Sequence, residues 1–110
     1  MIDTARVYDP VDVAQPPRVT VDRLWPRGIH KEDPRVGTWM PHVAPSNELR
    51  KWYHAHLDQY DDFAARYREE LADSDELAKL RAMGPVTLTT AAKDVAISHV
   101  PVLAQFLTQN

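Results

Sequence analysis

The chain has 110 residues, which fits a single domain over 1–110, and it contains no cysteine, so disulfides, thiolate nucleophiles and thiolate metal sites are excluded. Hydrophobic residues make up 44% and charged residues 26%, as in ordinary soluble proteins. The formal net charge of −3 argues against general electrostatic capture of nucleic acid. No apolar run is long enough to span a membrane, and the first residues lack the layout of a signal peptide, so we expect a cytoplasmic protein without membrane contacts.

The first half of the chain predicts two short strands and little other regular structure. Residues 5–8 form the first candidate strand, which ends at Pro10 because proline cannot donate to a ladder. Residues 19–22 form the second, since Val, Thr and Val in alternation favour a strand. Residues 25–28 predict a turn, and a short helix fits over 35–40.

Helices dominate the second half. Ser46 is expected to cap a helix over 47–53, and a second helix is expected to follow the acidic stretch 73–76 and to end at Gly84. Between these two, a helix that starts at Asp58 is predicted by apolar residues spaced i, i+3, i+4, i+7 and i+11, namely Tyr60, Phe63, Ala64, Tyr67 and Leu71. Residues 86–89 predict a third strand, and Ser98 is expected to cap the last helix.

A long helical connection between the second and third strands is what parallel pairing requires. We therefore predict a small three-layer α/β domain with a short, mainly parallel sheet flanked by helices. Ligands of such sheets bind beyond the carboxyl ends of the strands. Two such ends are residues 22–28 and 90–99, which would face each other if their strands are neighbours.

The residue types at these two strand ends suit an anionic ligand. Asp22 and His99 are the candidate catalytic groups, because a carboxylate and an imidazole can transfer protons near neutral pH. Arginine binds phosphate or carboxylate through two parallel hydrogen bonds, a tryptophan ring can stack on a planar ligand, and the start of a helix attracts anions. The candidate ligand-binding residues are Arg23, Trp25, Arg27, Lys93 and Ser98.

Structural roles are also open for the same residues, and large aromatic residues such as Trp25 more often pack in a core than stack on a ligand. Asp22 can instead pair with Arg23 to hold the loop, and Trp25 can serve as a packing anchor. Asp94 can cap its own turn, which would leave Lys93 solvated.

No metal or cofactor is expected. Ligands spaced as in 54–58, His-x-His-x-Asp, diverge on a helix, and no zinc-type spacing is present. With only three glycines, the chain has neither a phosphate loop nor a Gly-x-Gly-x-x-Gly motif.

Two functions remain open from the residues. One is binding or hydrolysis of a small anionic ligand, with a phosphate-bearing molecule as the first candidate. The alternative is a nucleic-acid or protein binding module that uses the basic segment 18–52, in which Trp25, Trp39 and Trp52 interleave with cationic residues.

Residues 21–28 read Val-Asp-Arg-Leu-Trp-Pro-Arg-Gly, and this string resembles the YeaO-like branch of domain-of-unknown-function family 488. Further family blocks follow in the same order: Ala44-Pro45-Ser46, Leu49-Arg50-Lys51-Trp52, Tyr67-Arg68-Glu69-Glu70-Leu71 and Ala91-Ala92-Lys93-Asp94. The resemblance runs from residue 6 to 107 and implies a small cytoplasmic bacterial protein and no particular reaction. Two departures stand out. Gln-Pro-Pro at 15–17 replaces a glycine turn, and Ser98 replaces the asparagine that usually precedes the histidine.

Overall fold

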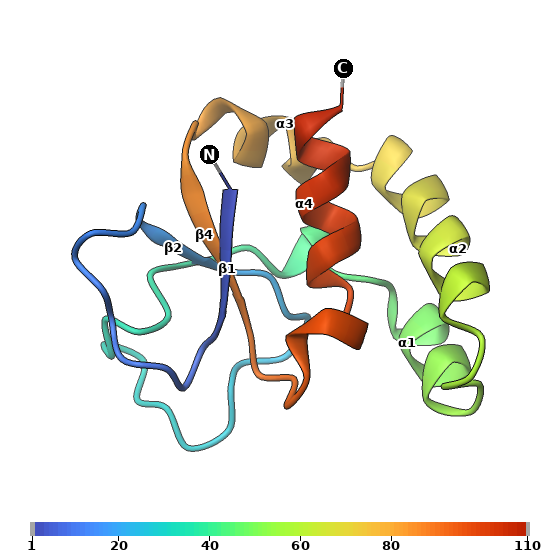
Figure 1. The fold of residues 1–110 in the computed structure, drawn as a ribbon, viewed down its shortest axis with the longest axis horizontal. Helices are drawn as coiled ribbons and strands as arrows, with labels where there is room; N and C mark the ends of the chain where they lie inside the picture. The colour runs from blue at the N-terminus through green and yellow to red at the C-terminus, as the bar shows by residue number, and fades with distance from the viewer. Residues whose placement is uncertain (1, 110) are drawn as a thin grey trace.

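The computed structural model describes residues 2–109 and contains a parallel sheet of four strands (Figure 1). The strands are β1 (Ile2–Arg6), β2 (Arg18–Thr20), β3 (Thr38–Trp39) and β4 (Val86–Thr90). Their order across the sheet is β1-β4-β2-β3, and Val19 of β2 lies opposite Leu88 of β4. The predicted α/β class is therefore confirmed, and β2 and β4, whose adjacency the sequence left open, are neighbours.

Four α-helices and two 3₁₀ turns complete the regular structure. They are η1 (Pro41–Val43), α1 (Asn47–His54), α2 (Tyr60–Ala72), α3 (Asp75–Ala82), η2 (Val95–Ile97) and α4 (Val100–Thr108). Residues of all four helices join one buried cluster with Val19, Val21, Val86 and Leu88, the side chains that the strand alternation places on one face of the sheet. The helices thus gather on a single side of the sheet (Figure 1).

Loops cover the opposite face of the sheet. Strand alternation places polar side chains there, and they hold the loops through backbone carbonyls. The hydroxyl of Thr20 donates to the carbonyl of Val36 at 2.8 Å. The buried guanidinium of Arg18 donates to carbonyl oxygens of Val7 at 3.4 Å, Arg35 at 3.2 Å and Pro10 at 2.8 Å. The third layer therefore consists of proline-interrupted chain.

The first half of the chain differs in detail from the sequence-based prediction. The first strand runs over Ile2–Arg6 instead of 5–8. The short helix expected over 35–40 is wrong, because residues 38–39 pair with β2 as strand β3. Gly37 makes this pairing possible, since its φ is +63° and a Cβ atom there would lie 2.1 Å from the carbonyl oxygen of Arg18.

The second half of the chain follows its predicted helix boundaries closely. The Ser46 hydroxyl accepts a hydrogen bond from the Leu49 amide at 3.1 Å, which makes Ser46 the N-cap of α1. The N-cap of α4 is His99, one residue later than expected. No helix among residues 2–109 is long and apolar enough to cross a membrane.

Candidate functional site

The carboxyl ends of β2 and β4 lie side by side, and the Asp22 carboxylate joins them. Its Oδ1 accepts a hydrogen bond from the Thr90 hydroxyl at 2.7 Å, and its Oδ2 accepts one from the Ala91 amide at 2.7 Å. Hydrogen bonds to a charged carboxylate are stronger than neutral ones. The expected pair between Asp22 and Arg23 does not form, because Nη2 of Arg23 donates to the Ala44 carbonyl at 3.0 Å. Asp22 therefore ties the two strand exits together.

His99 contacts the same junction from the start of α4. Its Nε2 lies 2.7 Å from the Val21 carbonyl oxygen and 3.5 Å from Oδ1 of Asp22. A carbonyl oxygen can only accept, so Nε2 carries the proton. Burial lowers the pKa of His99 below its usual value, and the nearby Asp22 carboxylate and the Val21 carbonyl oppose this shift. His99 is thus a neutral imidazole near neutral pH, with the lone pair on Nδ1.

A cleft of about 830 Å³ opens beyond this junction, between the strand exits and α1. All seven predicted site residues line it, namely Asp22, Arg23, Trp25, Arg27, Lys93, Ser98 and His99. They come from two chain segments about 70 residues apart, which the parallel pairing of β2 with β4 brings together. We call this space the basic cleft.

Besides Arg23, two of the predicted ligand-binding side chains have structural hydrogen bonds. Nε1 of Trp25 donates to the Ile29 carbonyl at 2.7 Å, so Trp25 is a packing anchor as well as part of the wall. The Ser98 hydroxyl donates to the Val95 carbonyl at 2.7 Å and accepts from the Val100 amide at 3.2 Å. Ser98 therefore satisfies a backbone amide at the start of α4 that an anion would otherwise contact.

Helix α1 supplies wall residues that the sequence analysis missed. Arg50, Tyr53 and His54 line the basic cleft from α1 and are spaced i, i+3 and i+4, and Leu57 lines it from the segment that follows the helix. This spacing places side chains on one face of a helix, and it is visible in the sequence. The helix over 47–53 was assigned from its N-terminal end, and which of its residues share a face was not considered.

Arg50 and Arg23 each have a buried guanidinium nitrogen that lacks a protein partner. Nε of Arg23 and Nε of Arg50 are both buried without a hydrogen-bond acceptor. Within residues 2–109, the Arg50 guanidinium makes no hydrogen bond, and neither arginine forms an ion pair with a carboxylate. Half-buried charges are usually paired, so these two arginines are exceptions.

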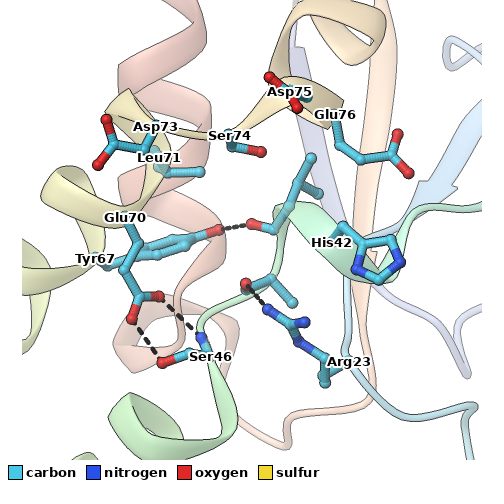
Figure 2. A pocket seen from close by; sticks show the side chains of 12 residues that line it. Arg23, His42, Ser46, Tyr67, Glu70, Leu71, Asp73, Ser74, Asp75 and Glu76 are labelled. Atoms are coloured by element: carbon cyan, nitrogen blue, oxygen red, sulfur yellow. Dashed lines mark hydrogen bonds between the residues drawn. The ribbon is translucent and has the colours of Figure 1, made fainter.

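A second hollow of about 610 Å³ shares Arg23 and Ala44 with the basic cleft, and Figure 2 shows its walls. We call it the acidic hollow, because its walls carry Glu70, Asp73, Asp75 and Glu76. Oε1 of Glu70 accepts from the Ser46 amide at 2.8 Å, and Oε2 accepts from the Ser46 hydroxyl at 2.6 Å. Across residues 2–109, no group of three or more histidine, aspartate or glutamate side chains is placed to hold a metal ion.

Tyr67 stands at the back of the acidic hollow, and its hydroxyl donates to the Val43 carbonyl (Figure 2). Burial raises the pKa of the Tyr67 phenol well above its usual range. Tyr67 is therefore an un-ionised hydrogen-bond donor that fixes the turn before α1, and its hydroxyl proton is already bound to the protein.

The fold and the basic cleft define a small α/β domain with a candidate binding site at the carboxyl edge of a parallel sheet. The chain belongs to a family whose model, described as "Inactive DUF488-N3 subclade", matches residues 1–110. This confirms the resemblance found in the sequence.

Relatives with high identity exist in two bacterial groups. An uncharacterised protein of Mycobacterium tuberculosis (strain ATCC 25618 / H37Rv) is 52% identical over 109 residues, covering 96% of this chain and 92% of the relative. Uncharacterised protein YeaO of Escherichia coli (strain K12) is 40% identical over 110 residues, covering 96% of each chain. No solved structure gives a significant match.

Proposed function

We propose that the basic cleft binds a small anionic ligand and does not convert it. The observation that carries this proposal is the half-buried Arg50, whose buried Nε lacks an acceptor, in the same cleft as Arg23, whose Nε also lacks one. A buried guanidinium N–H group without an acceptor is unfavourable. A phosphate or carboxylate in the cleft supplies acceptors in the planar geometry that guanidinium groups favour.

The charges around the cleft add to this argument. Arg23, Arg27, Arg50 and Lys93 line it, against two carboxylates, those of Asp22 and Asp94. The carboxylate of Asp22 already binds Thr90 and Ala91. The Asp94 carboxylate accepts from the Ala96 amide at 3.1 Å and so caps its own turn. The arginine and lysine side chains are therefore the groups left to meet a ligand, and they favour an anion.

The same contacts argue for binding over hydrolysis. Both oxygens of Asp22 are occupied by protein donors, so a base at this position would have to give up strong hydrogen bonds. The Nε2 proton of His99 is held by the Val21 carbonyl. No serine, threonine or cysteine among the cleft-lining residues is hydrogen-bonded to His99 as a nucleophile would be. The family description as inactive supports the same choice.

The alternative of a nucleic-acid or protein binding module draws less support from the placement of the basic segment 18–52. Arg18 is buried under the sheet, and Arg35 pairs with Asp33 at 2.8 Å. The Trp25 ring is half-buried at the cleft wall. The cations of this segment therefore do not share one flat surface of the kind that single-strand binding uses.

A titration with inorganic phosphate at constant ionic strength, followed by amide resonances, tests the proposal. We expect shifts at residues 22–24, 50–54 and 90–93. Arg50→Ala should weaken the affinity about tenfold or more, because a charge-assisted hydrogen bond is lost. Lys51→Ala is the matched control, since Lys51 is exposed on the same helix and does not line the cleft. Equal weakening by both variants, or shifts spread evenly over the surface, would refute a specific site.

Turnover is tested separately with phenyl phosphate. We expect inorganic phosphate to be released at the rate of the buffer alone. If release is faster and His99→Asn abolishes the excess, the protein is a hydrolase and the binding-only proposal is wrong.

A further inference from the structure

Large apolar side chains that are exposed to solvent gather at the rim of the basic cleft. Leu24 is 59% exposed, Leu57 is 61% exposed and Ile97 is 52% exposed, and all three line the cleft. They come from three separate parts of the chain: the β2 exit, the segment after α1, and η2. Exposed apolar residues scattered singly are ordinary, but a cluster around a cleft marks a binding surface.

Aromatic rings form much of the remaining wall, and protein contacts hold them in place. Tyr53 stacks on Phe63 with ring centroids 4.1 Å apart and planes 12° apart. Trp25 meets Trp39 edge to face at 5.3 Å, and the Tyr8 hydroxyl donates to the Arg27 carbonyl at 2.8 Å. Tyr8, Trp25, Tyr53 and Phe63 all line the cleft. Fixed rings present planar apolar surface at little entropic cost.

The volume of the cleft also exceeds what a bare inorganic anion needs. A space of about 830 Å³ lies in the range that drug-sized organic ligands occupy, and such sites combine an apolar lining with a few polar anchors. Here Arg23 and Arg50 are the anchors. Leu24 follows Arg23 directly in the chain, and Leu57 lies in the segment after α1, the helix that carries Arg50.

We propose that the ligand is an aromatic anion, with a phosphate or carboxylate group bound by Arg23 and Arg50 and a planar apolar body that contacts Leu24, Leu57 and Ile97. This inference rests on the proposed function, because it adds an apolar body to the anion of the same cleft. Guanidinium planes also stack on aromatic rings, so the two arginines favour a planar body over an aliphatic one.

A ligand series separates the charge of the ligand from its body. Inorganic phosphate, phenyl phosphate, benzoate and uncharged benzyl alcohol are titrated in turn, and dissociation constants are taken from amide shifts. We expect phenyl phosphate to bind about tenfold or more tightly than inorganic phosphate, because its ring leaves water. Benzyl alcohol should produce no saturable shifts. The ratio of phenyl phosphate to benzoate affinity then tells which acidic group the arginines prefer.

Variants of the rim locate the body of the ligand. Leu57→Ser and Ile97→Ser should each reduce the preference for phenyl phosphate over inorganic phosphate while leaving the affinity for inorganic phosphate unchanged. Val13→Ser is the matched control, since Val13 is 98% exposed and does not line the cleft. All three side chains are exposed, so the fold should persist, and the dispersion of the amide spectrum checks that it does.

The outcomes distinguish this inference from the function on which it rests. Equal affinity for phenyl phosphate and inorganic phosphate would refute the aromatic body while leaving anion binding intact. Benzyl alcohol binding as tightly as phenyl phosphate would refute the anionic head. An unchanged preference in both rim variants would refute the assigned location. Failure of phenyl phosphate, benzoate and inorganic phosphate alike to bind would overturn both proposals together.

Discussion

The acidic hollow and the basic cleft share Arg23 and Ala44, yet each has a half-buried charged side chain whose hydrogen bonding is the opposite of the other's. In the acidic hollow, the half-buried Glu70 is hydrogen-bonded through both oxygens to Ser46 (Figure 2). In the basic cleft, the half-buried Arg50 has no acceptor among residues 2–109. The pairing of charges, more than the size of the hollow, distinguishes a structural junction from a candidate binding site.

The remaining carboxylates of the acidic hollow have a local explanation. Asp75 and Glu76 lie in the first turn of α3, where the positive end of the helix dipole favours negative side chains. Asp73 is exposed beside them. Their clustering therefore follows from the start of a helix, whereas no helix end or carboxylate accounts for the arginines of the basic cleft.

The largest effect on stability is expected in the acidic hollow, where Glu70 is hydrogen-bonded to Ser46. Glu70→Ala removes both acceptors of Ser46 and leaves its amide without a partner at the start of α1. We expect the free energy of unfolding to fall by about 2 kcal/mol, the cost of losing hydrogen bonds to a charged group. Urea unfolding measures this loss, and Glu70→Gln should recover part of it because one amide oxygen can still accept.

Glu69→Ala is the matched control for that change. Glu69 precedes Glu70 on α2, is exposed and makes no side-chain hydrogen bond within residues 2–109. Its removal should alter the free energy of unfolding by less than about 0.5 kcal/mol. If both variants lose the same amount, the Ser46–Glu70 contact does not hold the acidic hollow together.

A smaller effect is expected at the junction of Asp22 and His99, which forms the base of the basic cleft. Because burial lowers the pKa of His99 in the folded protein, the unfolded chain binds more protons between that pKa and about 6.5. The stability that this pKa difference contributes should therefore be fully present above this window. The free energy of unfolding should then decline as the pH falls through the window. His99→Asn removes the titrating group, so its stability should fall less between about pH 7.5 and about pH 5.5.

Unfolding curves at several pH values test this slope. The variant is compared with the wild type at the same pH values, so the difference between the two slopes reports on His99. An equal decline in wild type and His99→Asn would show that His99 does not carry the pH dependence.

The contrast also explains how far the sequence could predict the site. The strands, the caps such as Ser46 and the parallel sheet could be predicted, because each depends on neighbouring residues or on general rules of parallel sheets. That the Asp22 and His99 ends meet followed only on the condition that their strands are neighbours. The partners of Asp22 could not be predicted in this way. Thr90 and Ala91 lie 68 and 69 positions away, and their contact depends on the exact register of β2 against β4.

The hydrogen-bond and ion-pair partners of the arginines could not be predicted from the sequence either. Arg18, Arg35 and Arg50 all belong to the basic segment 18–52, yet Arg18 bonds to carbonyls, Arg35 pairs with Asp33, and Arg50 has no acceptor among the described residues. Composition treats the three alike, because what separates them is the three-dimensional arrangement of backbone oxygens. For the same reason, β3 was missed, since two residues form a strand only when a neighbour is present to pair with them.

The smallest effect on stability should come from Arg50, and it would sharpen the contrast most. A paired, half-buried charge stabilises its surroundings, so its removal costs stability, whereas an unpaired one does not. We therefore expect Arg50→Ala to change the free energy of unfolding by less than about 0.5 kcal/mol, in either direction, while phosphate affinity drops. A loss of stability similar to that of Glu70→Ala would mean that Arg50 supports the fold, and the basic cleft would then be a second structural junction.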